Sequence, residues 1–443
     1  MYPLLSRLIP LTLPRVKAPI APLQNRRSGE ANPGIARCLK RGVWGAIGVL
    51  LSWCLGLSPV LAATPTGGTG TAVNWLPLDS GDNSEVTVPG FAQVLGPQDW
   101  HFPEDFGPHP QYQTEWWYYT GNLETPEHRP FGFQLTFFRQ SLAPESPHRP
   151  DTSPWRTPQL YSAHFTVSDI ADDRFYQFER FSRSAVGLAG SQGDPYGVWL
   201  QDWSVRTQGQ QVYLQGRAQT VALNLVLSPT PPVLQGHQGF SPKGPEPGNA
   251  SYYYSQVQQP THGEVIIAGQ RYPVQGLTWM DHEYSTSSLS PGTVGWDWFA
   301  LQGDDGSATM LYNLRREDGT PEPRSAGTFV SCARQHAPCA SRQANQQTQL
   351  QPTDWQLRVL ETWTSPQSHT QYPTRWHLRI PRLSLDLDIA AQMENQELVT
   401  AAATYWEGAV RYEGTQGDRP VKGQGYVEMT GYATRLDRLL GSP

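Results

Sequence analysis

Hydrophobic and polar residues alternate along short segments of the chain from about residue 98 onward. The clearest run covers residues 383–389, where apolar Leu383, Leu385, Leu387 and Ile389 alternate with polar Ser384, Asp386 and Asp388. A repeat of two with one polar face is typical of a half-buried antiparallel strand. Similar runs predict further strands at 131–138, 163–167, 221–227 and 425–432. Segments rich in turn formers predict loops at 122–130, 141–158 and 229–247.

A weak internal repeat suggests how these strands are organised. Residues 116–123, a turn and residues 133–139 parallel residues 296–302, a turn and residues 310–315. Both copies are a strand led by tryptophan, a polar hairpin turn and a second strand that ends in arginine. Two copies of a β-meander barrel are the simplest architecture for this pattern, and we predict domains at 96–275 and 276–435.

The composition favours the same all-β class. The 443 residues include 41 Gly and 40 Pro, and only 16% are charged while 11% are aromatic. Long surface helices need more charged residues, whereas short strands joined by Gly and Pro turns fit these values. A coiled coil, a helical repeat and a polytopic membrane protein are therefore disfavoured.

The N-terminal 63 residues have the parts of a secretory signal. Lys40 and Arg41 precede an uncharged apolar run at 43–57, and small residues follow at 62–63. This order predicts a signal peptide over 1–63 and a flexible leader over 64–95. The protein is then expected to be exported, to the periplasm or the cell exterior. The alternative is an uncleaved anchor, and in either case only this segment would contact a membrane.

Charge and cysteine content bound the partners and the chemistry. Residues 1–63 hold eight basic residues and one acidic residue, so the remaining chain is near −13 at pH 7. An acidic surface repels phosphate backbones, and we expect no nucleic-acid partner. Beyond the signal segment only Cys332 and Cys339 remain, and outside the cytoplasm a local disulfide is expected. Serine-hydrolase, zinc-protease and nucleotide-binding motifs are absent from the sequence.

Two neighbouring segments carry the candidate chemistry, 279–284 and 296–298. In an extended chain Trp279, Asp281 and Glu283 share one face, and Met280, His282 and Tyr284 share the other. A carboxyl buried among aromatic rings has a raised pKa and can donate a proton near neutral pH. Aromatic faces would stabilise a cation formed nearby, which suits protonation of an alkene followed by hydration or cyclisation.

The plainer alternative stays open at this point. The acids can cap a turn or pair with arginine while the indoles fill a core. His164 and His282 lie on separate strands without ligand spacing, so we predict no metal site. Residues 115–118 (Glu-Trp-Trp-Tyr) carry rings on both faces, which suggests that one face meets a cavity for an apolar ligand.

The segments 112–118, 133–139, 162–165, 279–283, 295–299 and 423–432 together resemble the carotenoid 1,2-hydratase (hydroxyneurosporene synthase) and AttH-like family. The resemblance implies two packed lipocalin-like β-barrels with an apolar binding region at their interface. It also implies hydration of a terminal isoprenoid double bond without a cofactor, or cyclisation of a polyene, with Asp281 as the acid and Trp279 and His282 beside it. The hydratases carry Asp-His-Asn-Trp where this chain has Asp-His-Glu-Tyr at 281–284, and many relatives are labelled hydrolases.

The sequence thus predicts an exported protein that binds an apolar, isoprenoid-like molecule and acts as a hydro-lyase or terpenoid cyclase without a cofactor. The alternatives are a lipocalin-like carrier and a secreted hydrolase. The predicted catalytic residues are Asp281, His282 and Glu283. The predicted ligand-binding residues are Glu115, Trp116, Trp117, Tyr118, His164, Trp279, Trp296, Asp297 and Trp298.

Overall fold

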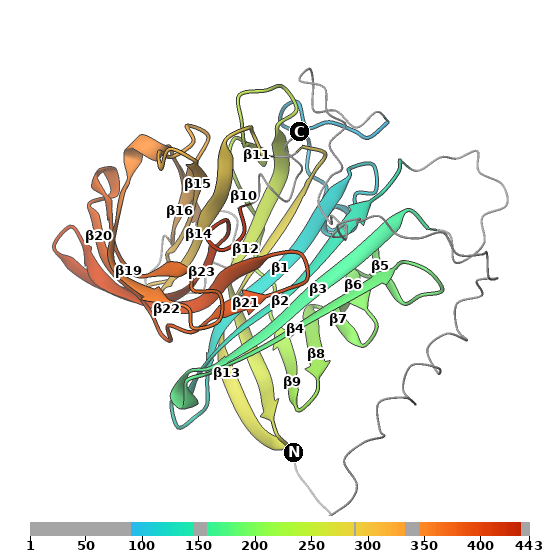
Figure 1. Cartoon of the computed structure of the whole chain (residues 1–443), viewed down its shortest axis with the longest axis horizontal. Helices are drawn as coiled ribbons and strands as arrows, with labels where there is room; N and C mark the ends of the chain where they lie inside the picture. Colours follow the sequence, from blue (N-terminus) through green and yellow to red (C-terminus); the bar gives the residue numbers. More distant parts are fainter. Residues whose placement is uncertain (1–89, 145–156, 288, 333–344, 436–443) are drawn as a thin grey trace, which may run out of the picture. The chain divides into compact units, whose positions relative to one another are not determined.

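A computed structural model of the chain describes residues 90–144, 157–287, 289–332 and 345–435. Their strands form two antiparallel sheets, one following the other along the chain (Figure 1). The predicted all-β class and the two antiparallel units are therefore confirmed. The predicted signal segment at 1–63, most of the leader and Cys339 of the predicted disulfide lie outside the described residues.

The first sheet contains thirteen strands in the order β4-β3-β2-β1-β13-β12-β9-β8-β7-β6-β5, with β10 and β11 paired to β12. Edge strand β4 contacts β6 near the other edge, so the sheet curls on itself. The strands are β1 (Thr114–Glu124), β2 (Pro130–Ser141), β3 (Gln159–Asp169), β4 (Arg174–Arg183), β5 (Ala189–Gln192), β6 (Gly197–Leu200), β7 (Trp203–Gln208), β8 (Gln211–Ala218), β9 (Val221–Leu227), β10 (Val233–Leu234), β11 (Phe240–Pro242), β12 (Ala250–Ile267) and β13 (Gln270–Ser285).

The second sheet contains ten strands in the order β17-β16-β15-β14-β23-β22-β20-β19-β18, with β21 paired to β22. Its curled strands are drawn from brown to red in Figure 1. They are β14 (Thr293–Gly303), β15 (Ala308–Arg316), β16 (Ala326–Cys332), β17 (Asn345–Leu350), β18 (Gln356–Thr364), β19 (Gln371–Ile380), β20 (Leu385–Ala391), β21 (Glu397–Val399), β22 (Thr404–Gln416) and β23 (Arg419–Met429).

Helical structure in the described residues is limited to four 3₁₀ turns. They are η1 (Glu104–Phe106), η2 (Ile170–Asp172), η3 (Pro352–Asp354) and η4 (Pro381–Leu383). None of the helical segments described has the length and apolar character that a membrane span requires.

The repeated hairpin found in the sequence occurs in both sheets. β1 pairs with β2, and β14 pairs with β15 in the same antiparallel manner. In each sheet the first strand of the hairpin also pairs with the last strand of the sheet, β13 in one and β23 in the other. The two hairpins therefore hold equivalent positions, which explains why their patterns match.

Some predicted segments differ in detail from the structure; for example, β1 continues to Glu124, into the loop predicted at 122–130. The run at 383–389 begins as a strand only at Leu385, because Leu383 lies in η4 and Ser384 has φ of 50°, which interrupts extended pairing. The loop predicted at 229–247 contains the short strands β10 and β11, which lie along β12 and cover part of its outer edge. The remaining predicted strands overlap β2, β3, β9 and β23.

The segment boundaries also fall elsewhere than the sequence pattern indicates. The predicted division between residues 275 and 276 falls within β13, which continues to Ser285 and pairs on both sides inside the first sheet. The predicted leader ends at residue 95, whereas Val94 is fully buried and the Ala92 N–H donates to the Gln111 carbonyl. The end of that segment is thus packed against the first sheet.

Apolar side chains form a core inside each sheet and a third cluster between the two sheets. The first core includes Trp117, Phe133 and Trp203, and the second includes Trp376 and Trp406. The cluster between the sheets is rich in aromatic residues: Tyr118, Tyr253, Trp279, Trp298, Tyr312 and Tyr426. Hydrogen bonds also cross between the sheets, including one from the Tyr118 hydroxyl to Glu407 Oε2 at 2.8 Å.

Candidate active site between the two sheets

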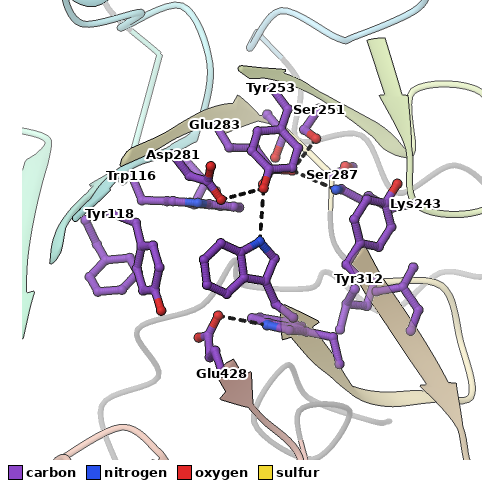
Figure 2. Close-up of a pocket in the computed structure, with 17 residues that line it drawn as sticks. Trp116, Tyr118, Lys243, Ser251, Tyr253, Asp281, Glu283, Ser287, Tyr312 and Glu428 are labelled. Atoms are coloured by element: carbon purple, nitrogen blue, oxygen red, sulfur yellow. Dashed lines mark hydrogen bonds and ion pairs between the residues drawn. The ribbon is translucent and has the colours of Figure 1, made fainter. Parts of the chain in front are cut away.

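A cavity of about 240 Å³ opens beside the aromatic cluster that joins the sheets (Figure 2). Strands from both sheets line it, so the site needs both halves of the chain. Most of its wall is aromatic or aliphatic, and a few charged and hydroxyl groups converge on it. The lining residues are Thr114, Trp116, Tyr118, Phe138, Lys243, Ser251, Tyr253, Asp281, Glu283, Ser285, Ser287, Leu289, Trp296, Trp298, Tyr312, Leu314 and Glu428.

Paired strands β1 and β13 present one face to this cavity and the other to the core of the first sheet. Tyr118 lies opposite Asp281 in the register, and Trp116 lies opposite Glu283. All four side chains line the cavity because alternate residues of a strand point to the same side. The predicted face of the segment 279–284 is therefore the one that meets the ligand space.

Asp281 lies in this wall with every contact made by a neutral donor. Its Oδ1 accepts hydrogen bonds from the Ser255 hydroxyl at 2.5 Å and the Trp279 indole at 2.7 Å, and its Oδ2 accepts one from the Tyr253 hydroxyl at 2.5 Å. Burial raises its pKa to about 7, and the nearby Glu283 adds to the rise, although the three hydrogen bonds oppose it. The carboxyl therefore exchanges its proton near neutral pH.

Glu283 and Lys243 form an ion pair in the same wall. The Lys243 ammonium lies 2.9 Å from Glu283 Oε1 and 4.0 Å from the centre of the Tyr312 ring. The Ser251 hydroxyl donates to the same carboxylate. Burial disfavours the ammonium, but Glu283, Tyr312 and Asp281 together outweigh this and hold the pKa of Lys243 above its usual value. Lys243 thus supplies a positive charge in a wall that also holds the carboxyls of Asp281, Glu283 and Glu428.

Glu428 reaches the cavity from the second sheet. It belongs to β23, and its Oε2 accepts a hydrogen bond from the Trp296 indole at 3.1 Å. The pKa of Glu428 is raised to about 7, mainly by burial and also by the charges of Asp281 and Glu283, while the Trp296 hydrogen bond opposes the rise. The cavity thus holds two carboxyls that titrate near neutrality, one from each sheet.

A second polar cluster lies on the opposite face of β1 and β13, away from the cavity. His282 Nε2 lies 2.8 Å from Glu115 Oε1, and His109 Nδ1 lies 3.0 Å from the same oxygen. Arg139 Nε donates to Glu115 Oε2 at 2.8 Å. The rings of Trp117 and His282 stack with their centres 4.9 Å apart. Glu115, His282 and Trp117 are fully buried, and they brace the strands from behind.

Charge in this cluster is balanced within it. Burial opposes ionisation of Glu115, but Arg139 and the two histidines hold its pKa well below the usual range. Burial lowers the pKa of His282 and keeps it neutral, whereas contacts with Asp105 and Glu115 raise the pKa of His109 despite burial.

The same cluster has the spacing of a metal site but not its charge. Donor atoms of His109, Glu115 and His282 lie within 4.8 Å of one another. The Arg139 guanidinium already donates a hydrogen bond to the Glu115 carboxylate, and its positive charge would repel a metal cation. The arrangement therefore fits a hydrogen-bonded brace better than a metal centre.

The family follows from a comparison of the whole sequence with known families. The pattern of the AttH-like family matches residues 93–432, which cover both sheets. The chain belongs to the AttH-like family. The AttH part of the resemblance seen in the sequence is confirmed, and carotenoid hydration remains a prediction.

Three similar proteins place this AttH-like chain among its relatives. A kievitone hydratase of Fusarium solani subsp. phaseoli is 26% identical over 175 residues, which are 38% of this chain and 46% of the relative, so under half of that protein is matched. The crystal structure of an AttH protein from Nitrosomonas europaea is 32% identical, covers 77% of this chain and 100% of its own, and has a TM-score of 0.66. The structure of a kievitone hydratase from Nectria haematococca shares the fold at 15% identity with a TM-score of 0.56, covering 79% of this chain and 98% of its own.

The predicted residues of this AttH-like chain divide between the two faces. Those that line the cavity are Trp116, Tyr118, Asp281, Glu283, Trp296 and Trp298. Trp279 touches the site through its hydrogen bond to Asp281. Glu115, Trp117 and His282 lie behind the wall, in the brace.

Two further predicted residues lie elsewhere in the AttH-like fold. Asp297 is paired with Arg315 at 3.0 Å and is not among the residues that line the cavity. His164 lies between the sheets, where its Nδ1 is 2.6 Å from the Tyr405 hydroxyl. Cys332 ends β16, while its predicted disulfide partner lies outside the described residues.

Lys243, Tyr253, Tyr312 and Glu428 also belong to the site, and sequence reasoning did not select them. Lys243 lies in a segment that the pattern indicates as loop, and Glu428 lies in a strand recognised only for its alternation. The run Tyr252-Tyr253-Tyr254 was the available signal for Tyr253. Three consecutive rings in one strand must face both sides of the sheet, so at least one of them lies away from the core of the first sheet.

Proposed function

We propose that the protein is a hydratase that adds water to a carbon–carbon double bond of an apolar, isoprenoid-like ligand held between the sheets. Asp281 supplies the proton, and the reaction needs no cofactor. The observation that carries this proposal is a buried carboxyl in an aromatic cavity whose pKa is raised to about 7. The relationship to proteins named kievitone hydratase supports the reaction class.

The chemistry of the wall fits the intermediate of such a reaction. Protonation of a substituted alkene leaves a positive charge on carbon, which water then attacks. Trp116, Tyr118 and Trp298 line the cavity, and the faces of such rings stabilise a nearby cation. A proton held by a carboxyl in a partly dry wall reaches carbon more readily than one in bulk water.

The contacts of Asp281 favour an enzyme over a carrier that only stores its ligand. A structural brace would have its carboxylate paired with arginine and away from the cavity. Glu115 with Arg139 and Asp297 with Arg315 have that arrangement. Asp281 instead faces the cavity, and its hydrogen-bond donors are two hydroxyls and an indole.

Incubation of the full-length protein with two probes tests the function. The probes are kievitone and the acyclic carotenoid neurosporene, each supplied in water enriched in heavy oxygen. We expect a product heavier by one labelled water, detected by mass spectrometry, from at least one probe. Recovery of both probes bound but unchanged would overturn the hydratase proposal and favour the carrier.

Export of the protein remains part of the proposal, on the sequence of residues 1–63. N-terminal sequencing of the protein isolated from its source is expected to begin near Ala63 or Thr64. An N-terminus at Met1 on a protein that is recovered from the cytoplasm would contradict it.

A further inference from the structure

The proposed hydration leaves one proton to be placed after water has attacked. Asp281 gives its proton to one alkene carbon, and the π electrons form the new C–H bond and leave a cation at the other carbon. A water oxygen then forms the C–O bond and carries a positive charge until one of its O–H bonds breaks. A base beside the attacking water has to take that proton.

Glu428 has the position for this task. Its strand belongs to the second sheet, whereas Asp281 belongs to the first, so the two carboxyls enter the cavity from different walls (Figure 2). Only its Oε2 has a hydrogen-bond donor among the described residues, the Trp296 indole. No ion pair to Glu428 occurs in the part of the chain that the structure describes.

The other carboxyls near the cavity already have an ion-pair partner or several hydrogen-bond donors. Glu283 forms an ion pair with Lys243 and accepts a hydrogen bond from the Ser251 hydroxyl, so its Oε1 is already engaged. Glu407 lies opposite Glu428 in the register of β22 and β23, but it is fully buried and accepts hydrogen bonds from Tyr118 and Gln134. Glu428 is therefore the carboxyl of the second sheet that lines the cavity.

We propose that Glu428 is the catalytic base that removes a proton from the water that attacks the carbon cation. This inference rests on the proposed function and adds the second half of the reaction. The balance is complete: the alkene gains a hydrogen from Asp281 and a hydroxyl from water, and Glu428 gains the remaining proton. Exchange with solvent in the cavity then returns a proton to Asp281 and removes one from Glu428.

The environment of Glu428 supplies the required protonation states. The carboxyls of Asp281 and Glu283 place negative charge near it when they are ionised, while the Trp296 indole donates to it. Two nearby carboxyls that each resist a second negative charge favour the state in which one is protonated and the other is ionised. That mixed state is the one with both an acid and a base.

Deuterium exchange separates the two steps. Wild-type protein, Asp281→Asn and Glu428→Gln are incubated in deuterium oxide with whichever of kievitone and neurosporene the wild type hydrates. We expect Glu428→Gln to lower the hydration rate by about 10²-fold. Deuterium should still enter the recovered alkene, because Asp281 continues to protonate carbon. Asp281→Asn should lose both deuterium entry and hydration.

Controls separate the base from a structural role. Glu413→Gln changes an exposed glutamate of β22 and should leave both rates unchanged. Hydration by Glu428→Gln within threefold of wild type would overturn the inference. Loss of deuterium entry together with hydration in Glu428→Gln would also overturn it, because the residue would then act before or during protonation.

A binding measurement decides the question if the wild type hydrates neither probe. Protonated dimethylgeranylamine carries a positive charge where the reaction would develop one, and its uncharged carbon isostere provides the reference. We expect Glu428→Gln to weaken the ammonium by about tenfold while the isostere binds as before. Equal binding of the ammonium by both proteins would overturn a role for Glu428 beside the charge. Failure of the proposed function alone would leave the ammonium difference intact.

Discussion

Replacing Asp281 by asparagine removes the acidic proton and preserves the side-chain shape. The amide oxygen can still accept from Ser255 and Trp279, and the amide N–H can donate to the Tyr253 oxygen. With a pKa of about 7, about half of the wild-type molecules hold this proton at pH 7. A carboxyl at the ordinary value would hold it in roughly one molecule in 1,500. We expect hydration to fall by about 10²-fold or more with ligand affinity nearly unchanged.

The same substitution should stabilise the fold at neutral pH. The folded state binds the Asp281 proton more tightly than the unfolded state does, because the pKa is raised from 3.8 to about 7. The contribution of this carboxyl to stability is therefore most favourable below about pH 4 and is lost as the pH rises to about 7. The whole shift corresponds to about 4 kcal/mol. Asparagine does not titrate, so its stability relative to wild type should rise by about 3 kcal/mol between pH 4.5 and pH 8.

Urea denaturation at several pH values measures this difference, and product formation measures the rate. Asp418→Asn makes the same chemical change at an exposed turn between β22 and β23, and should alter neither quantity. Hydration within threefold of wild type in Asp281→Asn would show that another group is the acid, with Glu283 the next candidate. Loss of activity with an unchanged pH dependence of stability would show that Asp281 is not a buried titrating carboxyl.

Two further substitutions test the wall around Asp281. Tyr253→Phe removes a hydrogen bond that favours the Asp281 carboxylate, so the pKa of Asp281 should rise. The alkaline limb of the pH–rate profile should then move to higher pH, and an unchanged profile would contradict this contact. Lys243→Met leaves Glu283 buried without its cation, so urea denaturation should show a loss of about 3–5 kcal/mol. Adding Glu283→Gln to that variant should recover much of the loss, and no recovery would contradict the pairing.

The strands were predictable because their periodicity is local. The repeated hairpins 116–139 and 296–315 indicated two related units, and they occupy equivalent positions in the two sheets. The end of the first sheet was not predictable in the same way. The sequence of β13 does not show to which sheet its last residues belong. Only the pairing of β13 with β1 and β12 assigns them to the first sheet.

Half of the site was predictable for the same reason. Alternation placed Asp281 and Glu283 on one face and His282 on the other, and the structure has that arrangement. Glu428 and Lys243 were not selected because each approaches the cavity from a distant part of the chain. Such a meeting depends on how the two sheets pack, and no local pattern encodes it.

The charges of the cavity argue against a purely storing role. Where a carboxylate braces this fold, as Glu115 does, an arginine such as Arg139 neutralises it. Asp281 and Glu428 have no such partner among the described residues, and their burial beside a third carboxyl disfavours the ionised state. An apolar ligand would be stored at least as well by a wall without them, since buried unpaired charge costs several kcal/mol. The cost and the chemistry have one origin, because the same desolvation that destabilises each carboxylate is what makes its acid a proton donor near neutral pH.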